Sequence, residues 1–345
     1  MVSYFSIYYS NEKETETMHG NNPGNNIHEL IEKLTAHYQK DGQDVSTHLE
    51  GLLNSNYLKY WDYIRLDSLL TLQNPRTPFP DEMVFIVYHQ ITELYFKLVM
   101  HELHQLKTAE NITGTIFLKR VERCNWYFGQ LISSFDIISV GLDQDQFLKF
   151  RVALTPASGF QSVQYRMVEV ACTDLINLVH TDSRDKYDDY STIEELFEEV
   201  YWKKGATDSK TGEKTLTLRQ FEEEYTSKLI QLAYECKSRN VWSIYKRLSL
   251  EDQGNTAIHD ALKQLDQHIN INWPLMHYKY ALGYLIKNKQ LYEATGGTNW
   301  KEYLPPRFQK IIFFPGLYSK EELDNWGKNW VEKEVISKIQ AAKQV

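Results

Sequence analysis

Residues 85–103 read Phe-Ile-Val-Tyr-His-Gln-Ile-Thr-Glu-Leu-Tyr-Phe-Lys-Leu-Val-Met-His-Glu-Leu. At about 100° per residue, one stripe of a helix holds four of these side chains, namely Phe85, His89, Phe96 and Met100. Residues 81–108 are therefore predicted to form one long helix, with Asp81 as its N-cap. His89 lies in this helix where a leucine is expected. A buried histidine satisfied by hydrogen bonds is the simplest interpretation.

Helical periodicity dominates the rest of the chain, and strand-type alternation is nearly absent. Helices are expected, the long ones with possible breaks, at 27–40, 57–73, 81–108, 114–140, 144–153, 159–180, 190–202, 217–249, 257–289 and 319–341. The polar segment 203–214 is interpreted as a loop or small hairpin. Residues 1–26 are polar and turn-rich and are expected to be a poorly ordered leader. No linker divides the remainder, so residues 27–345 are predicted to form one large all-α domain.

The composition excludes several classes of protein. The net charge of −8 argues against a surface for nucleic acid or for an anionic membrane, since both favour clustered Lys and Arg. Neither a signal peptide nor a run of about 18 apolar residues is present, which predicts a soluble cytoplasmic protein. Cys124, Cys172 and Cys236 stand far apart, outside any CxxC or CxxCH pattern. This spacing fits a reducing compartment and excludes a covalently attached c-type haem.

A second interpretation of the 81–108 helix is a metal site. His89 and Glu93 are one turn apart and can share an ion, and a 2-His-1-carboxylate iron site needs one further histidine. His101 lies about 120° around the helix from His89, so one straight helix cannot direct both side chains to the same ion. The spacing therefore disfavours non-haem iron.

A cationic side chain stands among aromatic residues further along the chain. Arg151 follows Phe147 by four residues and Phe150 by one, which presents its guanidinium beside rings as a fork for a carboxylate. A buried structural arginine paired with an acidic residue is the alternative. Ser158 marks a break before the next helix, where it can help to bind an anion or serve as an ordinary N-cap.

Two further features lie towards the C-terminus. His277 follows Trp273 by four residues, in a helix that Pro274 can initiate, and its neighbours are apolar or aromatic. It can be an axial haem ligand or a core residue. The run Thr-Gly-Gly-Thr at 295–298 is either a flexible lid or a helix stop with a loop, and it lacks the spacing of a phosphate-binding loop.

Several motifs occur in a fixed order along most of the chain. They are Tyr60-Trp-Asp-Tyr63, Ile64-Arg-Leu-Asp67, Leu69-Leu-Thr-Leu-Gln-Asn-Pro75, Asp81-Glu-Met-Val-Phe-Ile-Val-Tyr-His-Gln90, Glu93-Leu94, His101-Glu-Leu103, Phe150-Arg151, Pro156-Ala-Ser-Gly-Phe-Gln-Ser162, Gln164-Tyr-Arg166, Thr295-Gly-Gly297 and Phe313-Phe-Pro315. In this order, from about residue 57 to about residue 317, they resemble the tryptophan 2,3-dioxygenase family. The resemblance implies insertion of both atoms of O₂ across the indole C2–C3 bond of L-tryptophan. The product is N-formylkynurenine, in the first step of tryptophan degradation by the kynurenine route.

The resemblance also implies roles for individual residues. His277 becomes the proximal ligand of a non-covalent b-type haem, with one iron per subunit in a pocket enclosed by long helices. His89 becomes the distal histidine that faces the indole N–H, and Phe85 lies against the indole ring. Arg151 resembles the partner of the substrate carboxylate, with Phe147 as its ring neighbour.

Four more residues match positions of the same family. Ser158 is similar to the serine near a haem propionate and the distal side. Thr295 matches the threonine that meets the substrate ammonium. Tyr60 and Tyr63 match a pair that reaches into a neighbouring subunit's pocket, which implies a homotetramer.

The sequence departs from the family pattern near the predicted iron ligand. Trp273-Pro-Leu-Met precedes His277, where family members usually have an Arg-x-Arg-His type of sequence. The spacing from His277 to Thr295 is a few residues longer than usual, and Thr298-Asn-Trp300 stands where Ser-Ser-Gly is common. Two alternatives remain open: a haem monooxygenase or altered-substrate enzyme of the same superfamily, and a helical interaction protein without catalysis.

Overall fold

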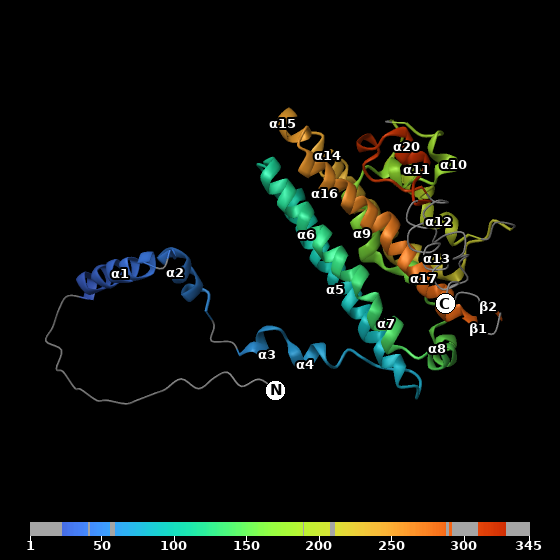
Figure 1. Cartoon of the computed structure of the whole chain (residues 1–345), viewed down its shortest axis with the longest axis horizontal. Coiled ribbons are helices and arrows are strands. Elements are labelled where there is room, and N and C mark those ends of the chain that lie inside the picture. The colour runs from blue at the N-terminus through green and yellow to red at the C-terminus, as the bar shows by residue number, and fades with distance from the viewer. Residues whose placement is uncertain are drawn as a thin grey trace, which may run out of the picture. The chain divides into compact units, whose positions relative to one another are not determined.

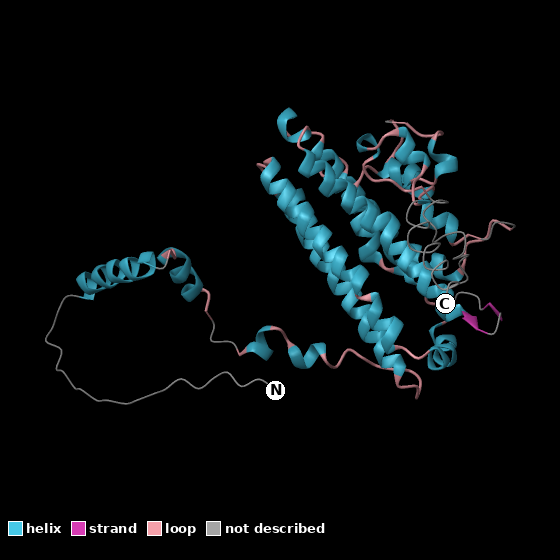
Figure 2. Ribbon diagram, in the orientation of Figure 1, coloured by secondary structure: helices cyan, strands magenta, loops and turns pink. Residues whose placement is uncertain are grey.

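The computed structural model describes residues 23–40, 42–55, 59–188, 190–207, 211–287, 290–291 and 310–328. The chain divides into two compact units between Leu72 and Gln73. Both units are helical where they are described (Figure 1; Figure 2). The single domain expected over residues 27–345 stays a prediction.

The described residues of the first unit form four helices: α1 (Pro23–Lys40), α2 (Val45–Leu53), α3 (Tyr60–Tyr63) and α4 (Leu66–Leu69). The helix α1 begins four residues earlier than the sequence analysis expected, inside the predicted leader, and α2 was not predicted. The prediction of one helix over 57–73 was wrong. Arg65 adopts a left-handed conformation with φ 54° between α3 and α4. A residue in that conformation cannot continue a right-handed helix, so two short turns form instead.

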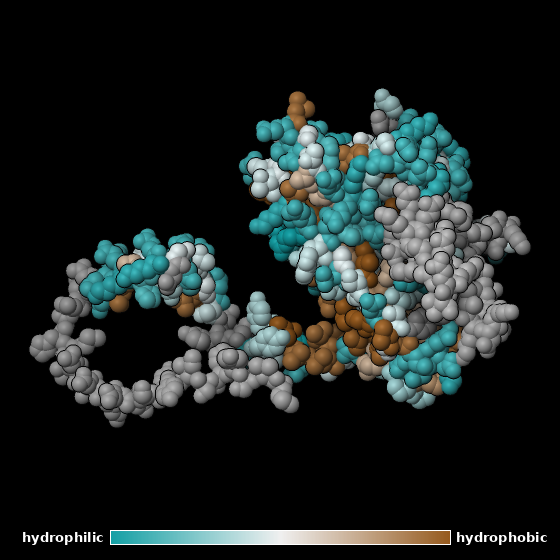
Figure 3. Space-filling view, viewed as in Figure 1, coloured by the Kyte–Doolittle hydropathy of each residue, from teal (hydrophilic) through white to brown (hydrophobic). Residues whose placement is uncertain are grey.

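The apolar side chains of this unit are mostly at its surface. None of the residues of α2, α3 or α4 is buried. The α1 side chains Ile27, Leu30 and Leu34 are 57%, 51% and 39% exposed. In Figure 3, hydrophobic atoms are visible on the surface of the α3 and α4 segment. The unit therefore presents more apolar surface than its own described residues cover.

The second unit contains the remaining helices. The α-helices are α5 (Asp81–Thr108), α6 (Gly114–Ser133), α7 (Phe135–Gly141), α8 (Gln144–Phe150), α9 (Val163–Cys172), α10 (Thr181–Arg184), α11 (Ile193–Glu198), α12 (Tyr201–Gly205), α13 (Leu216–Cys236), α14 (Val241–Tyr245), α15 (Leu250–Gln253), α16 (Thr256–Gln267), α17 (Trp273–Leu285) and α20 (Lys320–Asp324). Tighter 3₁₀ turns are η1 (Arg151–Leu154), η2 (Gly159–Gln161), η3 (Leu175–Leu178) and η5 (Pro315–Leu317), and η4 (His268–Asn272) is a π-helical turn. A short antiparallel pair, β1 (Ile286–Lys287) and β2 (Gln290–Leu291), aligns Ile286 with Leu291.

Long helices enclose the core of the second unit. The helix α5 packs along α6 and α9, α16 packs along α6, and α13 packs along α9 (Figure 1). Large side chains that are less than 2% exposed fill the space between them, among them Phe96, Phe117, Phe128, Phe150, Phe197, Phe313 and Phe314. The all-α fold class predicted from the sequence is confirmed. None of the helices in the described ranges is both long and apolar enough to cross a membrane.

Several predicted helices are interrupted in the structure. The segment 114–140 breaks at Ser134, whose hydroxyl donates to the carbonyl of Leu131 at 2.6 Å. The segment 159–180 divides into η2, α9 and η3, and 217–249 divides into α13 and α14. The short helices α10 and α15 were not predicted. Thr207 and Lys214 form an isolated antiparallel bridge in the segment predicted as a loop or hairpin.

Near the C-terminus the described helix is shorter than the predicted one. The sequence analysis expected 319–341, whereas α20 ends at Asp324 and residues 329–345 lie outside the described part of the chain. Ser319 caps α20 by accepting the backbone N–H of Glu322.

Candidate active site

The helix α5 has the bounds predicted from its periodicity, Asp81–Thr108, and carries Phe85 and His89 one turn apart. The two ring centroids are 4.1 Å apart at an interplanar angle of 35°. His89 Nδ1 lies 2.7 Å from the carbonyl oxygen of Phe85. Because a carbonyl oxygen can only accept, Nδ1 carries the proton and donates, which leaves the Nε2 lone pair of a neutral ring available.

Burial lowers the pKa of His89 below its ordinary value, although the hydrogen bond to Phe85 and the nearby Glu93 carboxylate oppose that shift. The imidazole is therefore neutral at pH 7. The interpretation of a histidine satisfied by hydrogen bonds therefore describes one of its two ring nitrogens. Its second nitrogen remains available for a ligand.

The start of α5 differs from the prediction in one detail. Pro80, and not Asp81, is the N-cap residue. The Asp81 carboxylate instead accepts the backbone N–H of Asp143 at 2.6 Å, and the Asp81 N–H donates to Gln146 Oε1 at 3.2 Å. Gln146 N–H in turn donates to Asp143 Oδ1 at 2.9 Å. These bonds fasten the first turn of α5 to the first turn of α8, which fixes the distance between the two helices near Phe85.

The first turn of α5 is also tied to the preceding loop. Glu82 is 2% exposed, and its carboxylate accepts the N–H of Arg76 at 2.8 Å and of Thr77 at 2.7 Å. Burial raises the pKa of Glu82, but these hydrogen bonds together outweigh burial and lower it below its ordinary value. The carboxylate is ionised and holds the loop in one conformation.

The helix α8 places three residues beside α5. Phe147 and Phe150 lie 6.0 Å and 5.7 Å from Phe85, centroid to centroid, and Phe150 is fully buried. Arg151 follows as the first residue of the 3₁₀ turn η1 and is 9% exposed. The predicted placement of its guanidinium beside aromatic rings stays a prediction. A guanidinium this deeply withdrawn from water binds an anion more strongly than one on the surface.

His277 lies on α17, which continues the α16 helix through the π turn η4. Trp273 N–H donates to the carbonyl of His268, the five-residue spacing of a π-helix. As expected, Pro274 lies in the first turn of an α-helix that begins at Trp273. The π turn before this helix was not predicted. Pro274 lacks an N–H and crowds the carbonyl four residues earlier, and the wider π turn just before it relieves that conflict.

The imidazole of His277 is half-buried in a corner between two aromatic rings. The Phe135 centroid lies 5.0 Å away at 88°, and the Trp273 centroid lies 4.8 Å away at 71°. The backbone carbonyl of Trp273 accepts its N–H. Burial, with a smaller contribution from the nearby His89, lowers the pKa of His277 to about 4. The ring is neutral and has one nitrogen left to bind a metal.

A chain of rings joins the two histidines. His89 contacts Tyr88 at 5.6 Å, Tyr88 contacts Phe135 at 6.0 Å, and Phe135 contacts His277. The helices α5 and α17 both pack against α8. The structure thus brings Phe85, His89, Phe147, Phe150 and Arg151 to the same part of the second unit as His277. Two neutral imidazoles among aromatic side chains suit a flat apolar cofactor with one axial nitrogen ligand.

Sequence analysis missed Phe135 and Tyr280 and gave Trp273 no structural role. Phe135 is the first residue of α7, is 2% exposed, and stacks on Tyr280 at 5.0 Å and 9°. No local pattern singles out Phe135, because its ring partners on α17 lie well over a hundred residues away in the sequence. Trp273 lies four residues before His277 and Tyr280 three residues after it. This helical spacing was the signal in the sequence that places both rings beside the histidine.

Ser158 is the N-cap residue of the short turn η2, and its N–H donates to Gln161 Oε1 at 3.1 Å. Gln161 Nε2 donates onward to the carbonyl of Thr217 at 3.3 Å. These contacts agree with the alternative interpretation of Ser158 as an ordinary N-cap residue. Its predicted role near a haem propionate stays a prediction.

The non-haem iron interpretation finds no support in the contacts of α5. Gln164 Nε2 donates to the Glu93 carboxylate at 2.8 Å and to the Glu93 carbonyl at 2.9 Å. His101 is exposed, and the buried Glu102 pairs with Arg120 and Arg123 of α6. Across the described ranges, no group of three or more His, Cys, Asp or Glu side chains could hold a metal ion.

Three predicted site residues fall outside the described part of the second unit. Tyr60 and Tyr63 belong to α3 in the first unit and are 70% and 76% exposed. Thr295 lies outside the described residues, as does the rest of the Thr-Gly-Gly-Thr run.

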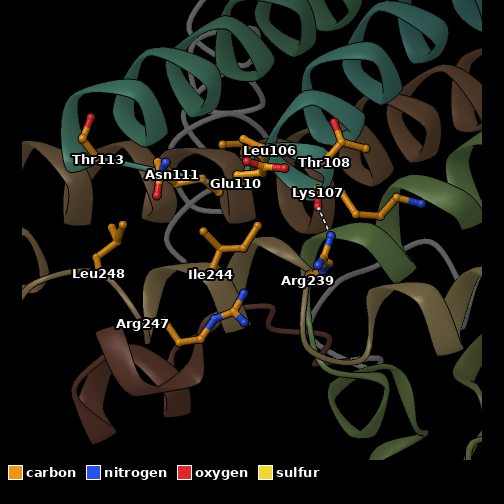
Figure 4. Close-up of a pocket in the computed structure, with 12 residues that line it drawn as sticks. Leu106, Lys107, Thr108, Glu110, Asn111, Thr113, Arg239, Ile244, Arg247 and Leu248 are labelled. Carbon is orange, nitrogen blue, oxygen red and sulfur yellow. Dashed lines mark hydrogen bonds between the residues drawn. The ribbon is translucent and has the colours of Figure 1, made fainter.

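A cavity of about 520 Å³ opens at a different part of the second unit. Its lining comes from the end of α5, the loop to α6, and the α13–α14 region, and includes Leu106, Ile244, Leu248 and Arg247 (Figure 4). Arg239 Nη1 donates across it to the carbonyl of Lys107 at 3.3 Å. None of the candidate site residues lines this cavity, so it is separate from the site of His89 and His277.

Comparisons with known proteins agree with the order of these elements. A family model described as Tryptophan 2,3-dioxygenase matches residues 46–276, a range that contains α5, α8 and α9 and ends one residue before His277. A tryptophan 2,3-dioxygenase of Ruegeria sp. is 41% identical over 114 residues, 32% of this chain and 40% of the relative. One of Bacillus cereus is 40% identical over 115 residues, 33% of this chain and 41% of the relative.

The chain thus spans about two fifths of the length of those two relatives. A tryptophan 2,3-dioxygenase of Shewanella woodyi is similar over a longer range, 30% identical over 275 residues, which is 76% of this chain and 90% of the relative. The family match covers more than half of the chain, and its range includes both Phe85-His89 and Phe147-Arg151. The chain belongs to the tryptophan 2,3-dioxygenase family.

Proposed function

We propose that this protein is a haem-dependent dioxygenase that inserts O₂ across the indole C2–C3 bond of L-tryptophan and releases N-formylkynurenine. The observation that carries the proposal is the pair of neutral imidazoles, His89 of α5 and His277 of α17, close enough for one to lower the pKa of the other. Aromatic side chains surround both rings. Family membership adds independent support.

His277 is the residue that would hold the haem. Its N–H is bound by the Trp273 carbonyl, so the remaining nitrogen points its lone pair away from the backbone and can bind iron. The three cysteines of the chain are all free and buried, and none lies near His277 in sequence. A neutral nitrogen ligand therefore suits this site, and the haem is held without covalent attachment. When bound, the haem supplies the oxygen chemistry.

His89 would orient the substrate. With Nδ1–H donated to Phe85, its Nε2 can only accept, and an indole N–H is a donor only. The pKa of His89 is lowered, so the ring is far too weak a base to remove the indole proton in the ground state. The side chain thus aligns the indole by one hydrogen bond, while the Phe85 ring lies against the indole plane.

Arg151 would bind the substrate carboxylate, and Phe147 would contact the substrate beside it. Arg151 is buried next to Phe150, so a carboxylate bound there is shielded from water. Charge-assisted bonds of this kind are about twice as strong as neutral ones. Thr295 is proposed as the contact of the substrate ammonium, and Ser158 as a contact on the haem side.

The proposed assembly is a homotetramer in which Tyr60 and Tyr63 reach a neighbouring subunit's pocket. Their exposure, 70% and 76%, supports a role at a surface that another chain covers. We propose a cytoplasmic location, which agrees with the acidic composition and with the three free cysteines.

The test begins with the absorbance spectrum of the purified protein, where a Soret band supports haem binding and its absence would refute the proposal. The reduced enzyme is then mixed with L-tryptophan and isotopically labelled O₂. Two labelled atoms in N-formylkynurenine support dioxygenation. One labelled atom in the product identifies a monooxygenase and overturns the proposed reaction.

A further inference from the structure

Phe135 contacts more of the rings around the proximal side than any residue the family motifs singled out. Its centroid lies 5.0 Å from His277, 4.8 Å from Trp273 and 5.0 Å from Tyr280. It is 2% exposed and comes from α7, whereas the other three rings all come from α17. The ring therefore fastens a separate helix against the helix of the predicted iron ligand.

The angles between the Phe135 ring and its neighbours suit a role in orienting the His277 imidazole. Phe135 is nearly perpendicular to the His277 ring, at 88°, and nearly parallel to the Tyr280 ring, at 9°. Perpendicular and offset-stacked pairs are the favoured arrangements of aromatic rings. Any rotation of the imidazole about its Cβ–Cγ bond changes the first of these contacts.

A polar contact supports the same arrangement. Asp136, the residue after Phe135, accepts a hydrogen bond from the Tyr280 hydroxyl at 3.3 Å. Tyr280 lies one turn after His277 on α17, so this bond and the ring stack join the same two helices. The Trp273 carbonyl, whose hydrogen bond raises the pKa of His277, is a neutral acceptor and gives little directional charge.

We propose that Phe135, supported by Tyr280, is a positioning residue that sets the orientation of the His277 imidazole and so the strength of its bond to the haem iron. The inference rests on the proposed function, in which His277 is that ligand. In physical terms, ring contacts from α7 hold the imidazole in place, and a charged partner does not. Loss of the Phe135 ring frees the imidazole to rotate without removing it.

The test compares Phe135→Leu with Phe128→Leu. Phe128 is a fully buried core residue of α6 that contacts Phe96 at 6.1 Å and serves as the matched control for loss of a core ring. Two readouts are used on reduced, haem-loaded protein: the iron–histidine stretching frequency by resonance Raman spectroscopy, and the rate of haem transfer to an excess of apomyoglobin. Circular dichroism follows the helix content of each variant.

Phe135→Leu is expected to shift or broaden the iron–histidine band and to speed haem loss by roughly tenfold, as the ring contacts with His277, Trp273 and Tyr280 disappear. Phe128→Leu is expected to keep the wild-type band even where it lowers the melting temperature. The inference is overturned if Phe135→Leu retains the wild-type band and rate, or if Phe128→Leu changes both to the same extent.

Tyr280→Leu provides a second route should Phe135→Leu not fold, because Tyr280 is only half-buried. It removes the stacked ring and the bond to Asp136, and a smaller shift of the same sign is expected. A wild-type band in that variant counts against the inference. Failure of the proposed function looks different: His277→Ala would then keep the wild-type iron–histidine band, or the wild-type protein would bind no haem.

Discussion

Replacement of Arg151 by alanine tests the proposed recognition of the substrate carboxylate. Arg151 is 9% exposed and lies next to the fully buried Phe150, so a carboxylate bound there exchanges water for the guanidinium. A charge-assisted hydrogen bond contributes about 1.5–3 kcal/mol, which corresponds to roughly 10- to 150-fold in the dissociation constant. Arg151→Ala is therefore expected to weaken L-tryptophan binding within that range.

A ligand without a carboxylate separates this interaction from a structural effect. Tryptamine keeps the indole and the ammonium of L-tryptophan, so its affinity is expected to change by less than about threefold in Arg151→Ala, as for an interaction that is absent. Dissociation constants for both ligands can be measured by titrating the haem absorbance. The ratio of the two changes gives the free energy of the arginine–carboxylate interaction alone.

Lys149→Ala is the matched control, because Lys149 is a nearby cation on α8 that is exposed and lies over the Phe79 ring at 5.7 Å. It is expected to leave both affinities unchanged. Equal losses for L-tryptophan and tryptamine in Arg151→Ala would show that the arginine supports the fold and does not bind the carboxylate. Equal effects of the two alanine variants would indicate general electrostatics.

Four more outcomes are expected. Glu82→Gln should lower the melting temperature by a few degrees, since it weakens two charge-assisted bonds worth about 2 kcal/mol in total. The pKa of Glu82 is lowered in the folded protein, so the difference in stability from wild type should be present above about pH 4.5. It should vanish as acid protonates the wild-type carboxylate. A deficit that does not shrink as the pH falls further below 4.5 would contradict this. His89→Ala should retain measurable turnover with haem and substrate binding intact, and complete loss of chemistry would argue for an obligatory base. The lowered pKa of His89 predicts that wild-type kcat/KM falls only as pH drops below 6.5, which a pH profile measures. His277→Ala should lose tightly bound haem, and an unchanged Soret band at full occupancy would exclude it as the ligand.

The sequence predicts the distal side of this site better than the proximal side. Phe85 and His89 lie on a helix whose periodicity and bounds are visible in 28 consecutive residues. Phe147 and Arg151 share a single turn, so their relation is also local. These residues can be placed together because one helical period decides which side chains lie on the same face.

Tertiary contacts decide the rest, and they leave little trace in local sequence. The sequence analysis assigned Pro274 a helix start, but it did not predict the π turn that joins α16 to α17 just before Pro274. Phe135 meets His277 from a helix more than 140 residues away. Arg65 breaks a predicted helix because of a backbone conformation that arginine rarely adopts, and no periodicity can reveal that.

The π turn at His268–Asn272 gives this segment an unequal tolerance to shortening and to lengthening. A π turn accommodates one residue more than an α turn, so it acts as a spacer between α16 and α17. Removal of one residue there lets the π turn return to an α turn, and the residues after it keep the helix faces that they occupy now. Insertion of one more residue has no such room and rotates everything after it by about 100°. His277 would then leave its position beside Phe135 and turn towards a different neighbour.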